Sequence, residues 1–367
     1  MKLVVFGLTI SSSWGNGHAT LWRGLVGALA KRGWTVVFCE KDVPYYAMNR
    51  DLWEIPGGDL ILYDDFEDFR GVFRSHLEDA DVAMVTSYCP DGLAASDLVL
   101  EAARPLKVFY DLDTPVTLSR LGDGGAASYV GPRGFRDFDL VLSYTGGPAL
   151  QALRDRLGAR RAVPLYGHVD PGQYRPAGRD PVFAGDLSFI GTYAADRQDR
   201  LTALLIEPAQ RRPDLRFVIA GAQYPADFPW TDNIYFLRHL APEAHPAFYA
   251  SSRLTLNVTR RAMAQSGWCP SGRLFEAAAS GAAILTDWWD GLDAFFAPGR
   301  EILVGHDTGD ALAALAMSDA ELRRIAEAAR ARVLAEHTSD ARAADFERAV
   351  AEARHPLPAR RPQTEEA

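Results

Sequence analysis

A helix is predicted to begin near residue 270, and its first residues have the chemistry of an anion site. Ser271 and Gly272 precede a helical pattern, and the free backbone N–H groups of a helix start bind phosphate well. Glu276 lies in the first turns of the same helix, where a carboxylate can accept hydrogen bonds from both hydroxyls of a ribose. Alternatively, Glu276 is an acidic residue that complements the positive end of the helix dipole.

Four arginines could add positive charge beside this helix: Arg197, Arg260, Arg261 and Arg273. Such cations would stabilise a diphosphate group, whose negative charge grows as the bond to it breaks. Arg260 and Arg261 follow the apolar segment 254–258, so at least one of them should point toward a cleft. The alternative for Arg197 is an exposed side chain paired with a neighbouring aspartate.

The first half of the chain carries a loop that could approach a second ligand. Residues 11–18 join an apolar segment to a helical pattern, and their glycines allow close backbone approach. Asn16 and Gly17 are therefore expected in an acceptor loop. His18 could deprotonate an acceptor hydroxyl or bind a phosphate as a cation, because histidine titrates closest to neutrality. It could equally cap the helix or pack at its start.

Two carboxylates follow the apolar segment 107–110. Asp111 and Asp113 are two residues apart at a predicted strand end, which places both on one face. They could form a catalytic base or line an acceptor pocket, although residues 113–115 could also be a turn with an Asx-type hydrogen bond. Two carboxylates without further ligands are thin support for a divalent cation, so no metal is expected.

These residues require two parallel sheets to bring them together. Short apolar segments alternate with helical patterns in both halves, which is typical of sheets covered by helices on both faces. The predicted strands are 3–6, 34–38, 82–85, 107–110, 140–142, 187–190, 217–220, 234–236, 254–258, 283–286 and 302–304.

Proline and glycine cluster from residue 164 to 181, which marks a domain boundary. We therefore predict an N-terminal domain over 1–170 and a C-terminal domain over 171–338. A last helix is expected over 340–354 with Ser339 as its N-cap. The tail 355–367 is expected to be disordered.

Composition narrows the class of partner. The 367 residues carry a formal net charge of -9, which argues against a nucleic-acid surface and favours a small-molecule partner. Three cysteines at spacings that match no zinc site or disulfide framework indicate a reducing compartment. Residues 1–7 are typical of a first strand rather than a secretory signal, and no apolar run could span a bilayer. We expect a cytoplasmic protein without a membrane span.

The chain resembles group 1 glycosyltransferases, and most closely their CgeB-like branch, which is named after a spore-maturation protein. Six segments carry the resemblance: 271–282, 285–287 and 295–302 in the second half, and 14–18, 22–25 and 110–115 in the first. It implies the α/β GT-B fold, in which two Rossmann-like domains face a central cleft. It also implies that the C-terminal domain binds a nucleotide-sugar donor, with Glu276 on the ribose, while the N-terminal domain receives an acceptor and the last helix packs back on it.

The implied activity is hexosyltransferase-like transfer of a sugar to an acceptor hydroxyl, with no cofactor and no metal. One departure concerns Trp268. Retaining members of the family often have a second glutamate eight positions before the one that matches Glu276, and Trp268 stands there instead. A retaining mechanism is therefore not carried over, and Trp268 is expected to stack on a sugar or base or to pack between domains. Two alternatives stay open: a nucleotide-sugar epimerase of related fold, and a catalytically silent sugar-binding or scaffold protein.

Overall fold

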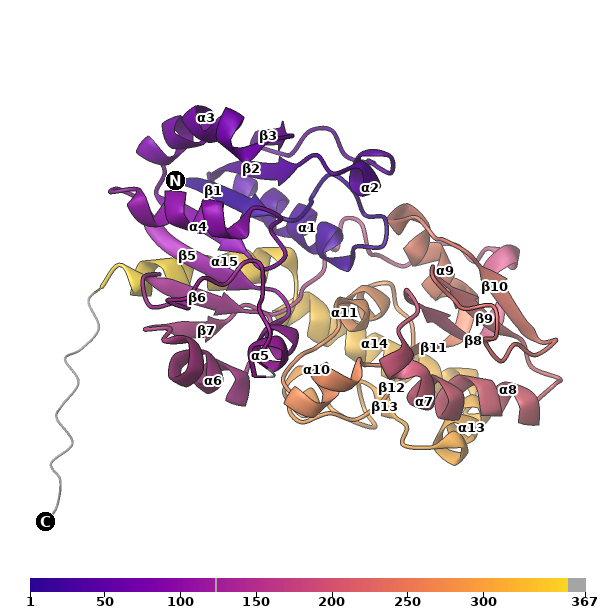
Figure 1. Ribbon diagram of the computed structural model, residues 1–367. Helices are drawn as coiled ribbons and strands as arrows, with labels where there is room; N and C mark the ends of the chain where they lie inside the picture. The colour runs from indigo at the N-terminus through magenta and orange to yellow at the C-terminus, as the bar shows by residue number, and fades with distance from the viewer. Residues whose placement is uncertain (123, 356–367) are drawn as a thin grey trace, which may run out of the picture.

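The computed structural model describes residues 1–122 and 124–355, which form two α/β domains side by side (Figure 1). Except for His355, the predicted disordered tail lies outside the described residues. Each domain is built on one parallel sheet with helices on both faces.

The first domain contains a seven-stranded sheet in the order β3-β2-β1-β4-β5-β6-β7. Its strands are β1 (Lys2–Gly7), β2 (Thr35–Lys41), β3 (Gly58–Tyr63), β4 (Val82–Thr86), β5 (Leu106–Asp111), β6 (Leu140–Ser143) and β7 (Ala162–Pro164). Its helices are α1 (Gly17–Lys31), α2 (Pro44–Ala47), α3 (Phe66–Glu78), α4 (Gly92–Glu101), α5 (Thr114–Gly122) and α6 (Pro148–Leu157). Residues 3–6 of β1 are fully buried because helices cover both faces of the sheet.

The second domain contains a six-stranded parallel sheet in the order β10-β9-β8-β11-β12-β13. Its strands are β8 (Gly185–Ile190), β9 (Phe217–Ala220), β10 (Ile234–Leu237), β11 (Ser252–Asn257), β12 (Ile284–Thr286) and β13 (Leu303–Val304). Its longer helices are α9 (His245–Ser251), α11 (Gly272–Ala279), α13 (Thr308–Ala316) and α14 (Asp319–Glu336). Shorter turns of helix are η1 (Pro181–Phe183), η2 (Ala195–Arg197), α7 (Gln198–Leu201), the π-helical η3 (Thr202–Ile206), α8 (Glu207–Arg211), η4 (Pro242–Ala244), α10 (Arg261–Ser266) and α12 (Leu292–Phe295).

The strand order changes direction at equivalent places in the two sheets. In the first sheet β1 lies between β2 and β4, and in the second β8 lies between β9 and β11. In open parallel sheets, ligands bind outside the carboxyl ends of the strands at such a switch point. The loops that follow β1 and β8 are therefore the expected position of a site.

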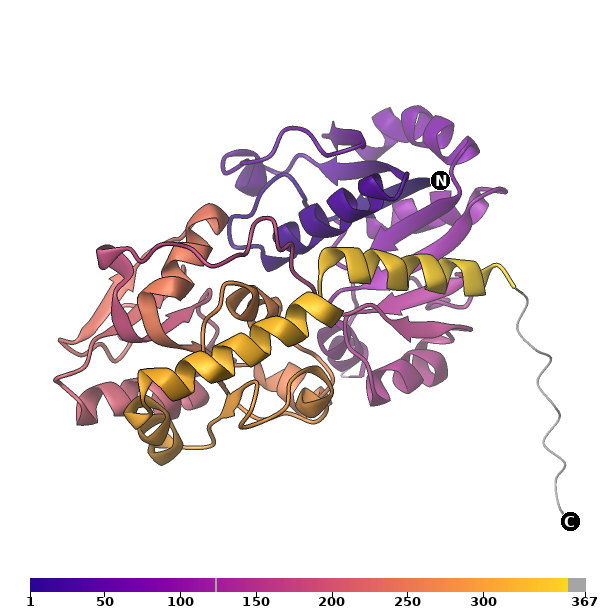
Figure 2. The same ribbon diagram turned by 180° about the vertical axis from the view of Figure 1, so that it is seen from behind.

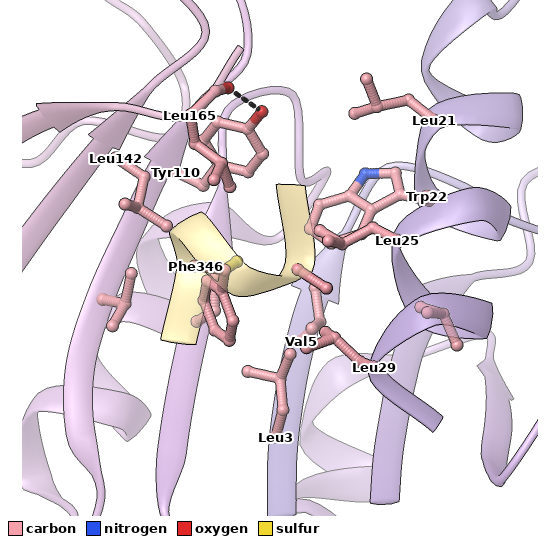
Figure 3. Close-up of a cluster of buried hydrophobic side chains, with 14 of the residues drawn as sticks. Leu3, Val5, Leu21, Trp22, Leu25, Leu29, Tyr110, Leu142, Leu165 and Phe346 are labelled. Atoms are coloured by element: carbon pink, nitrogen blue, oxygen red, sulfur yellow. Dashed lines mark hydrogen bonds between the residues drawn. The ribbon is translucent and has the colours of Figure 1, made fainter. Parts of the chain in front are cut away.

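The last helix, α15 (Ser339–Ala353), leaves the second domain and packs against α1 of the first (Figure 2). Phe346 is fully buried in the same apolar cluster as Trp22 and Tyr110 (Figure 3). At the edge of this contact Glu347 pairs with Arg32 at 2.6 Å. The core of the first domain therefore contains residues from both ends of the sequence.

The start of α15 differs from the prediction by one residue. Thr338 is the N-cap, since its side chain accepts a hydrogen bond from the backbone N–H of Ala341 at 3.2 Å. Ser339, the predicted cap, is the first helical residue, and its hydroxyl lies 3.0 Å from Nδ1 of His168. The cap prediction was wrong because Thr and Ser are both good caps and stand side by side.

We expect Phe346→Ala to lower the free energy of unfolding of the first domain by about 3–5 kcal/mol, because it leaves a cavity in a buried cluster. Urea unfolding followed by tryptophan fluorescence measures this change. Arg348→Ala is the control, since Arg348 is exposed on the same helix and should change stability by less than about 0.5 kcal/mol. A loss no larger than that of the control would show that α15 is not part of this core.

Two segments cross between the domains next to each other. The first runs from Pro164, where β7 ends, to Gly185, where β8 begins, and the predicted boundary at residues 170 and 171 lies within it. The second is the junction of α14 and α15, and Val169 and Thr338 form a parallel bridge between the two segments. Any change in the angle between the domains must be accommodated there.

Candidate functional site

A cavity of about 430 Å³ lies between the two domains at the carboxyl ends of their strands. The first domain contributes the loop after β1, the start of α1 and the turn after β5. The second contributes the loops after β8 and β11 and the start of α11. This is the position expected from the strand order.

The start of α11 presents free backbone N–H groups to the cavity. Ser271 is the N-cap, but its side chain makes no capping bond, and its Oγ instead accepts from Nε of Arg273 at 3.2 Å. Within the described residues, the N–H groups of Gly272 and Arg273 have no acceptor. Together with the helix dipole they form an anion site.

Two half-buried arginines stand beside this helix start. Nη1 of Arg273 donates to the carbonyl of Ile190 at 2.7 Å and Nη2 to that of Val258 at 3.3 Å, so this side chain joins the ends of β8 and β11. Arg197 donates to the carbonyl of Thr192 at 3.0 Å, while its buried Nε has no partner among the described residues. Burial lowers the pKa of Arg197, and the charges of Arg273 and Arg260 lower it further. A bound anion would relieve this crowding of like charges.

Arg260 and Arg261 point in different directions. Arg260 lines the cavity and pairs with Asp196 at 3.2 Å. Arg261 pairs with Asp199 at 2.6 Å, and its side chain is 57% exposed. The structure does not bring Arg261 to the cavity, because its side chain extends to Asp199 and is largely exposed, so it is removed from the candidate donor residues.

Glu276 lies on the cavity wall and contacts both domains. Its Oε1 is 3.4 Å from Oγ1 of Thr20, which belongs to α1 of the first domain. Burial raises the pKa of Glu276, whereas the nearby Tyr174 hydroxyl and the charge of Arg273 oppose the rise. The carboxylate therefore lies on the cavity wall next to the first domain.

His18 faces the cavity from the first turn of α1. Its backbone N–H is capped by Oδ1 of Asn16 at 3.1 Å, and Nδ2 of Asn16 donates to the carbonyl of Thr9 at 3.3 Å. Burial lowers the pKa of His18, and the charge of Asp113 raises it in part. The imidazole is therefore neutral at pH 7 and could accept a proton. Asn16 fixes the helix start, and Gly17 leaves the wall open beside it.

The two aspartates at and beyond the end of β5 do not share a face. The strand ends at Asp111, so its alternation does not extend to Asp113, and the prediction of a shared face was wrong. Asp111 is fully buried, and its Oδ1 accepts from the N–H of Asp113 at 3.2 Å and from Oγ1 of Thr117 at 3.0 Å. Burial raises the pKa of Asp111 to about 6. Only Asp113 reaches the cavity, where it accepts from the Tyr88 hydroxyl at 2.7 Å.

Glu40 organises the loop that carries His18, and the sequence analysis missed it. It is fully buried at the end of β2 and accepts two bonds from Ser11, at 3.0 and 2.6 Å, one from Thr9 at 2.6 Å and one from Ile10 at 2.8 Å. The sequence signal that could have revealed this role is a charged residue near the end of an otherwise apolar strand. Such a residue requires hydrogen-bond partners when it is buried.

Trp268 packs between the domains rather than in the cavity. It has a positive φ of 49°, and its indole lies against Gly147 and Gly291, where an added Cβ would clash with the ring. Its carbonyl accepts from the N–H of Gly146 in the first domain at 2.9 Å. At the position where retaining members of the family often have a glutamate, this chain therefore has a tryptophan that makes an interdomain contact.

In ranges 1–122 and 124–355, no three or more His, Cys, Asp or Glu side chains are grouped so that they could hold a metal ion. Within the same ranges, no helix has the length and hydropathy needed to cross a membrane.

Comparisons with known proteins agree with this geometry. A search of curated proteins found no match, but a family profile described as "Glycosyl transferase-like" matches residues 197–348. Sucrose-phosphate synthase from Thermosynechococcus elongatus superposes with a TM-score of 0.68 at 14% identity, covering 96% of this chain and 99% of that one. The fold is GT-B.

Further solved structures share the GT-B fold. Anabaena Alr3699/HepE in complex with UDP and glucose has a TM-score of 0.67 at 13% identity, over 96% of this chain and 100% of that one. Trehalose-6-phosphate synthase OtsA has a TM-score of 0.67 at 12% identity, over 98% and 100%. The family profile and the shared GT-B fold support the glycosyltransferase superfamily.

Proposed function

We propose that this protein is a glycosyltransferase that moves a hexose from a nucleotide-sugar donor to an acceptor hydroxyl without a metal ion or cofactor. The observation that carries the proposal is the difference between the polar groups that the two domains present to the cavity. Arg197, Arg273 and the free N–H groups of α11 lie on its second-domain wall, and His18 and Asp113 lie on its first-domain wall. One structural neighbour, Anabaena Alr3699/HepE, has been solved in complex with UDP and glucose and in complex with UDP-glucose, which suits a donor of this class.

On the donor side, the diphosphate would lie at the start of α11. The N–H groups of Gly272 and Arg273 would bind its oxygens, and the guanidinium groups of Arg197 and Arg273 would stabilise the charge that develops on the leaving group. Glu276 would accept hydrogen bonds from the ribose hydroxyls. Arg260, held by Asp196, would add a further positive charge at the cavity wall.

On the acceptor side, His18 or Asp113 would take the proton from the attacking hydroxyl. Both line the cavity, and the charge of Asp113 acts on the imidazole of His18. Asp111 would act only by holding the turn that carries Asp113. We also place the protein in the CgeB-like branch and in the cytoplasm, on the segments described above and on the reduced state expected for its three buried cysteines.

Calorimetric titration with UDP, GDP, dTDP, CDP and ADP tests the proposal, because nucleotide binding requires no knowledge of the acceptor. Saturable binding of one nucleotide would support it and identify the donor class. Failure of all five with folded protein would contradict it and favour a silent scaffold. Incubation with the matching nucleotide-sugar alone then separates the alternatives, since an epimerase would convert the sugar without any acceptor.

We expect Glu276→Ala to weaken binding of the preferred nucleotide by about 10- to 100-fold, because it removes hydrogen bonds to a charged acceptor. The same titration measures the change. Glu327→Ala is the matched control, since Glu327 is exposed on α14 far from the cavity wall. Equal affinities of the Glu276→Ala variant and the unmodified protein would remove Glu276 from the site.

A further inference from the structure

A ring contact joins the two domains at the rim of the cavity. Trp14 lies in the loop after β1, and His239 lies in the loop after β10. Their ring centroids are 4.2 Å apart at an interplanar angle of 41°, which is a direct packing contact. His239 lines the cavity and is also exposed to solvent. Trp14 is half-buried between Ser13 and Gly15, which line the cavity too. The contact therefore stands where the cavity meets solvent.

The loop that carries Trp14 is held on both sides of this residue. Before it, Glu40 binds the loop by the four hydrogen bonds described above. The backbone N–H of Ser13 also donates to Oδ1 of Asp51 at 3.2 Å. After it, the N–H of Asn16 donates to the carbonyl of Ser13 at 3.2 Å and closes a turn that contains Trp14. Trp14 is therefore held in place relative to the first domain.

The loop that carries His239 is tied to the second domain in the same way. The carbonyl of Leu237, at the end of β10, accepts from the N–H of Gly221 at 2.9 Å. On the other side of His239, the carbonyl of Leu240 lies 3.2 Å from Nε2 of His245. Because each ring belongs to a loop that its own domain holds, we expect the two rings to separate when the domains move apart.

The ring contact also leaves free the groups that are assigned to the nucleotide. Thr20 approaches the second domain as well, where its Oγ1 is 3.4 Å from Oε1 of Glu276, near the limit of a hydrogen bond. A ribose bound to Glu276 would compete with that bond. The contact between Trp14 and His239 uses neither this carboxylate nor the start of α11, so it can persist when the cavity is filled.

We propose that Trp14 and His239 form an interdomain latch, which holds the cavity closed over a bound nucleotide and sets the rate at which the nucleotide leaves. The proposal rests on the function proposed above. Opening of a closed site after reaction limits the turnover of many enzymes. A single ring contact suits this task, because it stabilises the closed arrangement by a small amount and can break in each turnover. The two crossing segments that meet at Val169 and Thr338 would accommodate the motion.

The test measures the association and dissociation rates of the preferred nucleoside diphosphate by surface plasmon resonance on the immobilised full chain. We expect Trp14→Ala to raise the dissociation rate by about 3- to 10-fold, because it removes a contact of the closed state. The association rate should stay within about twofold, since the nucleotide enters the open state. Trp14→Phe keeps an aromatic ring at this position and should restore most of the slow release.

His239→Ala removes the other half of the latch and should raise the dissociation rate by the same factor. The double variant should release the nucleotide no faster than either single variant, because both substitutions remove the same contact. Trp288→Ala is the matched control, since Trp288 is exposed in the second domain and lies outside the cavity wall. Its dissociation rate should equal that of the unmodified protein. Circular dichroism confirms that each variant folds.

The outcomes separate this proposal from the proposed function. An unchanged dissociation rate in folded Trp14→Ala, with nucleotide binding intact, would overturn the latch and leave the proposed function standing. Additive increases in the double variant would also overturn it, because they would show two independent effects. If the unmodified protein binds none of the five nucleotides, both proposals fail. Faster release in both single variants, with no further increase in the double variant, supports the latch.

Discussion

Arg273→Ala is expected to weaken nucleoside diphosphate binding by at least about 100-fold. The substitution removes a cation beside the anion site at the start of α11. It also leaves the carbonyls of Ile190 and Val258 without the donor that joins β8 to β11. Hydrogen bonds to a charged group contribute about 1.5–3 kcal/mol each, and the guanidinium can make two with a diphosphate. The combined loss exceeds two orders of magnitude.

Calorimetric titration measures this effect, and Arg261→Ala provides the matched control. Arg261 carries the same charge nearby, but it pairs with Asp199 outside the cavity, so its removal should change affinity by less than about twofold. Arg273→Lys separates charge from geometry, since lysine keeps the charge and cannot bridge both carbonyls. Retained affinity in folded Arg273→Ala would exclude the diphosphate site described above.

The second large effect is expected on the acceptor side. Removal of the catalytic base should lower kcat by about 10²- to 10⁴-fold while nucleotide affinity stays within about twofold. His18→Ala and Asp113→Asn, assayed in parallel, identify which group is the base, since both line the cavity. Tyr88→Phe is the comparison variant, because it removes only the hydroxyl that bonds Asp113 at 2.7 Å. Normal kcat in both His18→Ala and Asp113→Asn would refute this assignment of the acceptor side.

The pH profile distinguishes the two candidates further. Burial lowers the pKa of His18 and the charge of Asp113 raises it. If His18 is the base, kcat is constant near pH 7 and falls as the pH drops below the pKa of His18, because the protonated imidazole cannot accept a proton. Asp113→Asn removes the charge that raises this pKa, so the acid limb should move to lower pH. An acid limb that does not move would show that His18 does not control it.

Most strands were predictable because a buried parallel strand is apolar along its whole length. All six strands of the second sheet lie within two residues of their predicted bounds. β3 and β7 were missed for physical reasons. β3 is a half-buried edge strand, so apolar residues occupy only part of it, and β7 has three residues and ends in Pro164.

The site residues that could be predicted from the sequence are those that lie close together along the chain. Ser271, Gly272 and Glu276 belong to one helix start, so their spacing alone places them together. Arg261 and Asp111 were assigned wrongly because the direction of a side chain at a strand end or in the loop beyond it depends on packing. The contact between Thr20 and Glu276 could not be found from the sequence, since the two residues are brought together only by tertiary folding.

The packing of α15 on α1 has a consequence for the order in which the chain folds during synthesis. Residues 1–164 emerge from the ribosome first, but the apolar cluster that contains Trp22 and Leu29 is completed only when Phe346 arrives. The second domain, synthesised in between, can fold before the first is closed. The face of α1 that packs against α15 therefore stays uncovered until the last helix has been synthesised.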